Sequence, residues 1–376
     1  MDWLKGKRVG LIAHPASISS KGIHAGEMLR RVSGMELTCL FGPEHGFVGR
    51  GGAGEEIGDL THPEWHIPIY SLYGETRRPT SRMLEEVDIL VFDLQDLGAR
   101  PYTYVSTLRH VLEAAAEHHK TVIIADRPLP LPNVIDGPML EPSFESFVGF
   151  VRTPVVYGMT PGETACWMQK ELGLDLALYV APMKGYARNS EWPQFGLGWI
   201  PPSPAIKSID CARGFPFAVF FEALPSVDHG RKTPMPFQLI GAPWLNAVEL
   251  KSRLAHCDLP GMEFAPCSYT TPSGLYAGQS LHGLRVRVAD PASARPVRAA
   301  IQVISLIQEL HGAERLWRHE GVREEFFDKL MGTDSVRKAL QAGTPPDEIA
   351  ASWNPTHQSF LEARQAVLLY HSPSRA

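Results

Sequence analysis

Several features that would assign this chain to a class at once are missing. No segment approaches the roughly 18 consecutive apolar residues of a transmembrane helix. The 36 basic and 41 acidic residues give a formal net charge of −5, and there is no tract of Lys and Arg, so no basic face for a nucleic-acid backbone is expected. The amino terminus leads into the strand-like residues 9–13 without the apolar core of a signal peptide. We therefore expect no membrane span and no nucleic-acid partner.

The chain contains few cysteines, and their spacing does not indicate pairs. The five cysteines lie at positions 39, 166, 211, 257 and 267, and no two form a CxxC pair. This spacing argues against a disulfide framework and against a structural zinc site, and it favours free thiols in a reducing compartment. We expect a cytoplasmic protein, although an exported protein trimmed of its leader has the same appearance.

The chain lacks a dinucleotide-binding motif after its first predicted strand and lacks common nucleophile motifs. The turn after residues 9–13 reads HPAS, not G-x-G-x-x-G, and the chain has no G-x-x-x-x-G-K-[ST], G-x-S-x-G or H-E-x-x-H. No cofactor is therefore expected. A metal site built from His14, His45, Asp93 and Asp96 is conceivable, but their spacing is generic, and no metal is predicted.

The first half alternates short apolar runs with helical patterns, which is typical of βαβ units in a doubly wound parallel sheet. The length of 376 residues favours two domains. Strands are predicted at residues 9–13, 37–41, 67–71, 89–93, 121–125, 176–181 and 284–288. Helices are predicted at residues 22–32, 81–87, 105–119, 161–170, 295–310 and 358–369. Residues 185–245, rich in Trp, Pro and Gly, are expected to form long irregular binding loops between the domains.

The string GPEHG at residues 42–46 follows a predicted buried strand. Ligands of open α/β sheets bind beyond the carboxyl ends of such strands, so Glu44 and His45 are expected to project into a crevice. The neighbouring glycines allow another segment or a ligand to approach the backbone closely. The alternative is an ordinary surface turn that carries an incidental charge.

Polar side chains also follow the other predicted strands. Carboxylates, amides, an arginine fork and tyrosine rings are the groups that bind polyhydroxylated ligands. The alternative for the aspartates is helix capping or ion pairing with Arg100 and Arg127. Glu163 is expected to complete a capping box with Thr160, with a ligand-binding role as the alternative. The candidate residues at the strand ends are His14, Asp93, Gln95, Asp96, Arg100, Tyr102, Tyr104, Asp126 and Arg127.

Several long strings give the chain a resemblance to the exo-β-N-acetylmuramidase family. They are FGPEHG at 41–46, PIYSLYG at 68–74, VFDLQDLGAR at 91–100, DRP at 126–128, YGMTPGE at 157–163, WIPPSP at 199–204, LIGAPW at 239–244 and LLY at 368–370. The resemblance implies a Rossmann-like catalytic domain, placed at residues 1–200, and a smaller α+β auxiliary domain, placed at residues 201–376. One departure is noted: relatives commonly read EGTN before a Gly-Arg, where this chain has EALP at 222–225 and DHGR at 228–231.

The resemblance also implies removal of N-acetylmuramic acid from the non-reducing ends of peptidoglycan fragments. Such chemistry needs a proton donor and a second group at the oxocarbenium-like centre. Glu44 is the predicted acid, because a partly desolvated cleft favours a protonated carboxyl, and Asp96 is the weaker candidate for the second role. Arg100, Arg127 or Arg231 is expected to bind the lactyl carboxylate, and Tyr102 or Tyr104 to stack on the sugar. The alternatives are a non-catalytic amino-sugar binder and a metal-dependent hydrolase.

Overall fold

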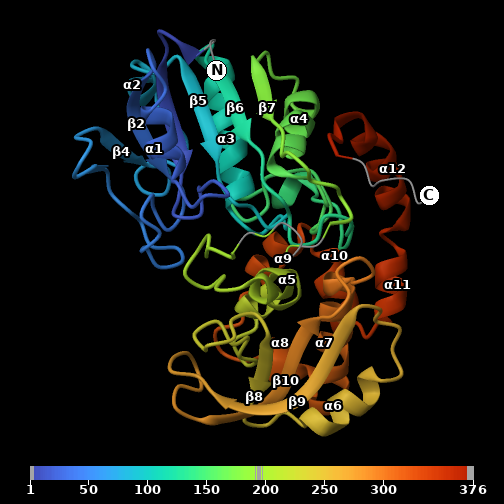
Figure 1. The fold of residues 1–376 in the computed structure, drawn as a ribbon. Helices are drawn as coiled ribbons and strands as arrows, with labels where there is room; N and C mark the ends of the chain where they lie inside the picture. Colours follow the sequence, from blue (N-terminus) through green and yellow to red (C-terminus); the bar gives the residue numbers. More distant parts are fainter. Residues whose placement is uncertain (1–3, 191, 193–195, 197, 371–376) are drawn as a thin grey trace.

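The computed structural model describes residues 4–190, 192, 196 and 198–370, and these form two sheets of very different size (Figure 1). The larger sheet has seven strands in the order β3-β4-β2-β1-β5-β6-β7, all parallel to their neighbours except β3. Six of these strands were predicted, and the short antiparallel β3 was not. The strands are β1 (Arg8–Ala13), β2 (Glu36–Gly42), β3 (Leu60–Thr61), β4 (Pro68–Ser71), β5 (Ile89–Asp93), β6 (Thr121–Ala125) and β7 (Leu178–Ala181).

Helices cover both faces of this sheet because its central strands are apolar on both sides. Along β5, Leu90 and Phe92 join the core beneath one set of helices, whereas Ile89 and Val91 join a smaller core on the opposite face. Such two-sided burial is typical of doubly wound sheets, so the predicted fold class is confirmed. The first set comprises α2 (Ser81–Leu84), α3 (Tyr104–Glu117) and α4 (Pro161–Glu171), and α1 (Ala25–Arg30) covers the other face.

Local capping fixes where two of these helices begin. The hydroxyl of Thr160 accepts from the Glu163 amide, and the Glu163 carboxylate accepts from the Thr160 amide at 2.9 Å, which confirms the predicted capping box. At α2 the cap is Thr80 and not Ser81. That helix ends at Leu84, three residues before the predicted end.

The second half contains a three-stranded antiparallel sheet with helices packed on it. Only residues 284–288 of that sheet, and the helix at 295–310, were predicted. The missed helix α5 is almost wholly buried and contains Pro216, so it has no polar face that would produce a helical period. The elements are α5 (Ile209–Ala218), η4 (Val219–Ala223), β8 (Leu239–Ala242), α6 (Ala247–Leu254), β9 (Met262–Thr270), β10 (Ser280–Val288) and α7 (Pro296–His311).

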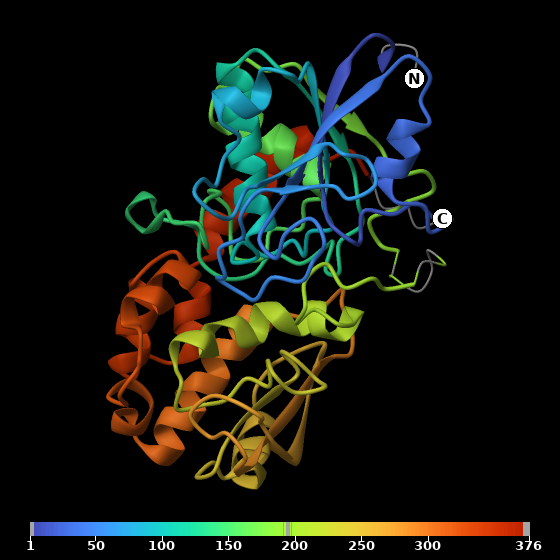
Figure 2. The same cartoon turned by 90° about the vertical axis from the view of Figure 1, so that its left-hand side faces the viewer.

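The carboxyl-terminal helices lead the chain back to the first sheet (Figures 1 and 2). They are α8 (Ala313–Trp317), α9 (Glu324–Met331), α10 (Ser335–Gln341), α11 (Pro346–Ala351), α12 (Asn354–Arg364) and the short η5 (Gln365–Val367), and a further short helix, η2 (Pro142–Phe144), follows β6. The last helix was predicted at 358–369, so it begins and ends earlier than expected. The domain boundary at residue 200 remains a prediction, although the two sheets lie on either side of it.

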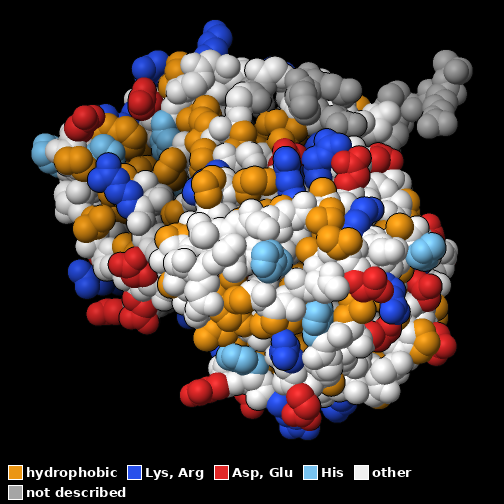
Figure 3. All heavy atoms as spheres, turned by 90° about the horizontal axis from the view of Figure 1, so that it is seen from below, with side chains coloured by type: hydrophobic (Ala, Val, Ile, Leu, Met, Phe, Trp, Pro, Cys, Tyr) orange, Lys and Arg blue, Asp and Glu red, His pale blue; other side chains and the backbone are white. Residues whose placement is uncertain are grey.

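The predicted irregular stretch at residues 185–245 contains α5 and β8, so it is less irregular than expected; its residues 191, 193–195 and 197 lie outside the described part. On the face in Figure 3, Lys and Arg side chains are interspersed with Asp and Glu. Across the described residues, no helix combines the length and the apolar character needed to cross a bilayer.

Candidate active site

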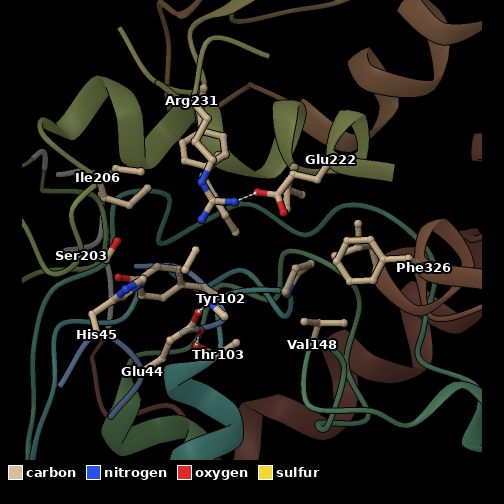
Figure 4. Close-up of a pocket in the computed structure, with 18 of the residues that line it drawn as sticks. Glu44, His45, Tyr102, Thr103, Val148, Ser203, Ile206, Glu222, Arg231 and Phe326 are labelled. Carbon is tan, nitrogen blue, oxygen red and sulfur yellow. Dashed lines mark hydrogen bonds and ion pairs between the residues drawn. The ribbon is translucent and has the colours of Figure 1, made fainter. Parts of the chain in front are cut away.

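A cavity of about 410 Å³ lies between the carboxyl end of the large sheet and the second half of the chain (Figure 4). The loop after β2 and the segment leading into α3 form one wall. The segment from α5 to residue 237, together with α9 and the residue before it, forms the other wall. Four of the predicted site residues line this cavity: Glu44, His45, Tyr102 and Arg231.

Glu44 is held from two sides. Its Oε2 accepts a 2.6 Å hydrogen bond from the Thr103 hydroxyl, and its Oε1 accepts a 2.9 Å bond from the Gly54 amide. Only 8% of the residue is exposed, and both partners are neutral. The carboxyl therefore faces the cavity in a fixed orientation without a cation bonded to it.

The backbone around Glu44 makes this position possible. His45 has a left-handed φ of 72°, and its Nδ1 lies 2.9 Å from the Gly51 carbonyl, which ties the loop to itself. A Cβ on Gly42 would lie 2.4 Å from the Phe47 amide nitrogen, so only glycine fits where the strand meets the loop. The glycines were expected to let another segment approach the backbone closely, and at Gly42 that segment is the later part of the same loop.

The opposite wall carries a second carboxylate and two arginines. Glu222, at the end of η4, forms an ion pair with Arg231, and Arg323 donates to the Glu222 carbonyl at 2.7 Å. Burial raises the pKa of the Glu222 carboxyl, and the charges of Arg231 and Arg323 oppose that rise. In Figure 4 the Arg231 guanidinium extends into the cavity between Glu222 and Glu44.

Aromatic rings form much of the remaining surface. Tyr102 meets Phe215 edge to face, with ring centroids 5.6 Å apart, and it packs against Tyr104 at 4.7 Å. Tyr104 does not line the cavity: its hydroxyl donates to the Pro202 carbonyl at 2.5 Å. Of the two tyrosines considered for stacking on a sugar, only Tyr102 is in position.

Arg100 and Asp96 do not line the cavity, contrary to what their strand-end positions suggested. The Arg100 guanidinium is fully buried and donates to the carbonyls of Pro138, Thr153 and Met331. Asp96 accepts from the Tyr157 hydroxyl at 2.7 Å, and burial raises the pKa of its carboxyl to about 6. Arg100 therefore connects distant backbone segments and cannot bind a ligand in this cavity.

The predicted residues at the ends of β1 and β5 mainly bind one another. His14 accepts at Nε2 from the Gln95 amide (3.0 Å), and its Nδ1 lies 3.2 Å from the Ser17 hydroxyl. Burial lowers the pKa of His14 to about 3, so the ring is neutral. Asp93 forms an ion pair with Arg127, as the alternative interpretation of these residues anticipated.

Asp126 and Glu163 hold the end of the chain in place. Asp126 accepts from the Tyr370 hydroxyl at 2.7 Å and from the Gly162 amide at 2.8 Å, and burial raises its pKa to about 6. Glu163 forms a buried ion pair with Arg188 and accepts from the Leu369 amide at 2.8 Å. Neither carboxylate lines the large cavity.

Glu222, Thr103 and Arg323 are among the cavity residues that sequence reasoning missed. Glu222 appeared only as part of an altered loop, although a single acid within the apolar run 218–224 is a signal for a buried carboxylate. Thr103 lies between Tyr102 and Tyr104, which were predicted as sugar-stacking residues. Arg323 precedes a helix that was not predicted. In the described part of the chain, no group of three or more His, Cys, Asp or Glu residues is arranged to hold a metal ion.

The fold and the cavity define a class of two-sheet α/β proteins with a cleft, lined by carboxylates and arginines, between the two halves of the chain. Within that class the chain belongs to the exo-β-N-acetylmuramidase NamZ family, whose N-terminal model matches residues 9–210 and whose C-terminal model matches residues 213–370. It is 37% identical over 368 residues to the peptidoglycan β-N-acetylmuramidase NamZ of Bacillus subtilis, covering 98% of this chain and 88% of that protein.

Solved structures agree with this assignment. A crystal structure of a DUF1343 family protein from Bacteroides fragilis has a TM-score of 0.91 at 32% identity, covering 98% of this chain and 95% of that one. A second DUF1343 family protein from the same organism has a TM-score of 0.77 at 28% identity, covering 99% of this chain and 96% of that one.

Proposed function

We propose that this chain is an exo-acting glycosidase that removes β-linked N-acetylmuramic acid from the non-reducing ends of peptidoglycan fragments. The observation that carries the proposal is the pair of carboxylates, Glu44 and Glu222, on opposite walls of one cavity. Glycoside hydrolysis uses two such groups, one on each side of the scissile bond. The 37% identity to a peptidoglycan β-N-acetylmuramidase supports the same substrate class.

We assign the role of general acid to Glu44. The Thr103 hydroxyl and the Gly54 amide hold its carboxyl in one orientation at the cavity wall, where it can meet the glycosidic oxygen of a bound sugar. The proton passes from Glu44 to the glycosidic oxygen as the bond to the sugar breaks.

Glu222 takes the second role, in place of Asp96. Arg231, which is ion-paired with Glu222, favours its charged form and opposes the effect of burial on its pKa. The charged form suits Glu222 either to stabilise the oxocarbenium-like centre or to activate water. Asp96 lines no part of the cavity, so its carboxyl reaches neither face of a sugar bound there.

We assign recognition of the lactyl carboxylate to Arg231. Of the three arginines first considered, it is the one that lines the cavity. A guanidinium offers several N–H donors in one plane, so an arginine can hold Glu222 and a substrate carboxylate together. Tyr102 supplies an apolar wall for the sugar ring.

The direct test is turnover of a nitrophenyl β-N-acetylmuraminide beside the matching N-acetylglucosaminide, with and without a chelator. Hydrolysis of the muraminide alone, unaffected by chelation, is the expected result. Equal turnover of both glycosides would refute recognition of the lactyl group. Tight binding without turnover would favour the amino-sugar binder, and loss of turnover with chelator would favour the metal-dependent hydrolase.

We also propose a reducing, cytoplasmic compartment. All five cysteines are free thiols, and Cys39 and Cys211 are buried, which fits a compartment where disulfides do not persist. Fractionation of the native host tests this, and recovery of the protein only outside the cytoplasm would overturn it.

A further inference from the structure

A second cavity, of about 280 Å³, lies at the carboxyl ends of β1, β5 and β6. The chain runs from β1 outward to β2 and later returns to β5 on the other side of β1. The second cavity therefore lies at the switch point of the doubly wound sheet, where such folds bind ligands. The proposed mechanism does not use it.

Two polar groups beside this cavity have unused bonding capacity. The Nε2 of Gln95 donates to the carbonyls of Asp96 (2.9 Å) and Pro128 (2.8 Å), and these bonds fix the amide orientation. Its Oε1 then has no protein partner in the described part of the chain. Arg127 uses Nε for Asp93 and Nη2 for the Ile18 carbonyl, whereas its Nη1 has no such partner among the described residues.

Indole rings supply the apolar part of the wall. Trp192 and Trp199 meet edge to face with ring centroids 4.9 Å apart, and both line the second cavity. An aromatic surface beside an amide oxygen and a guanidinium suits a pyranose, whose C–H groups pack on rings and whose hydroxyl and acetamido groups form hydrogen bonds.

One strip of chain borders both cavities. Trp199 lines the second cavity, and Ser203 and Ile206 line the first. The Trp199 indole also donates to the Ile206 carbonyl at 2.9 Å. The α-carbons of Trp199 and Ser203 are at most about 14 Å apart, because four residues cannot extend further, and a short glycan can span such a distance.

Two other hollows adjoin the first cavity and fit a sugar less well. One shares His45 with it but lies on the other side of the loop that carries Glu44, with an apolar lining that includes Val48 and Leu60. The other is formed by residues 317–329 alone, and there the face of Phe326 is covered by the Arg323 guanidinium at 4.3 Å. Neither offers a fixed side-chain amide beside a pair of indole rings.

We propose that the second cavity binds an N-acetylated sugar on the reducing side of the scissile bond, so that the protein prefers glycan chains to single-sugar glycosides. The inference rests on the proposed function. Gln95 Oε1 accepts from a hydroxyl or acetamido N–H of that sugar, and Arg127 donates to an acetamido carbonyl or a hydroxyl.

The test compares two substrates: the nitrophenyl muraminide, which fills only the first cavity, and a tetrasaccharide of alternating N-acetylmuramic acid and N-acetylglucosamine. Ser20 has an exposed side chain at the rim of the second cavity, so Ser20→Trp fills the cavity without disturbing the core. Ser20→Ala leaves it open. Ser252→Trp places the same ring at an exposed position on α6, far from the lining residues of either cavity.

We expect Ser20→Trp to lower kcat/KM for the tetrasaccharide about tenfold, the equivalent of roughly 1.4 kcal/mol of lost binding, with unchanged turnover of the muraminide. Both controls should match the wild type on both substrates. Equal use of the tetrasaccharide by Ser20→Trp and the wild type would overturn the inference. Failure of the wild type to cleave the muraminide would overturn the proposed function instead, so the two failures are distinguishable.

Discussion

Two clusters of polar residues in this molecule have similar compositions, but only one of them lines the cavity between the two halves of the chain. In the strand-end cluster, Asp93 is paired with Arg127, and Asp126 and Glu163 bond the last residues of the chain. In the cleft cluster, Glu44 and Arg231 face open space. Acids, arginines and tyrosines occur in both, so residue type alone does not separate a ligand site from an internal brace. Contact with a cavity does.

We therefore expect substitutions in the cleft cluster to change kinetics, and substitutions of the strand-end residues that line no cavity, such as Asp126 and Glu163, to change stability.

Glu44→Gln should have the largest effect. The amide keeps the shape of the side chain but cannot deliver a proton, so kcat should fall by about two to four orders of magnitude, the range for general acid-base catalysis. Release of N-acetylmuramic acid from the tetrasaccharide measures it, because a sugar leaving group needs a proton whereas nitrophenolate leaves without one. Glu55→Gln is the matched control on the same loop, because Glu55 accepts from the Gly52 amide and does not line the first cavity. Undiminished activity of Glu44→Gln would exclude Glu44 as the acid.

Arg231→Ala should weaken recognition of the lactyl carboxylate. Loss of a charged hydrogen-bonding partner costs about 1.5–3 kcal/mol, equivalent to about a ten- to hundredfold weaker inhibition by free N-acetylmuramic acid. Arg231→Lys should lose less, and Lys232→Ala, at the exposed neighbouring position, should lose nothing. Equal inhibition of the wild type by free N-acetylglucosamine and by N-acetylmuramic acid would show that Arg231 does not recognise the lactyl group.

Asp96→Asn should change the pH dependence of stability. Burial raises the pKa of Asp96 to about 6 in the folded protein, so the folded state retains a proton that the unfolded state loses near pH 4. Wild-type stability should therefore fall as pH rises from about 4 to 6, by about 2 kcal/mol from this group.

Urea unfolding at the two ends of that range measures the effect. The asparagine variant lacks this contribution, and the similar ones from Asp126 and Asp136 cancel in the difference between the two proteins. Parallel stability curves would contradict the prediction. Retention of turnover by the folded variant would support Glu222 over Asp96 as the second catalytic group.

Tyr370→Phe should have the smallest effect. It removes a hydroxyl that donates to Asp126 at 2.7 Å and accepts from the Met183 amide at 2.9 Å, at a cost of about 1 kcal/mol. The urea midpoint should fall while kcat/KM stays unchanged. A kinetic defect without a loss of stability would contradict the stabilising role given to the strand-end cluster.

The sequence predicted most of the first sheet because its strands are continuous apolar runs bounded by turn residues. It also predicted that Glu44 and His45 lie beside a cavity, because they directly follow a buried strand, and ligands of such sheets bind beyond the strand ends. It could not distinguish Asp93 from Glu44. Both lie at the end of a strand, but the partner of Asp93 is Arg127, just beyond the end of the neighbouring strand β6. Pairing between strand ends depends on side-chain direction. Glu222 was missed because it follows a helix that is buried on all sides.

The last residues of the chain bond to side chains of the first half, and this affects how the protein folds during synthesis. Arg188 and Glu163, in the first half, bond the backbone of Tyr370 and Leu369. During synthesis the first half leaves the ribosome before these partners do. The buried ion pair of Arg188 and Glu163 therefore lacks some of its hydrogen bonds until nearly the whole polypeptide has been translated. A nascent chain stalled before residue 364 should therefore be cleaved by protease within the first sheet, whereas the released protein resists.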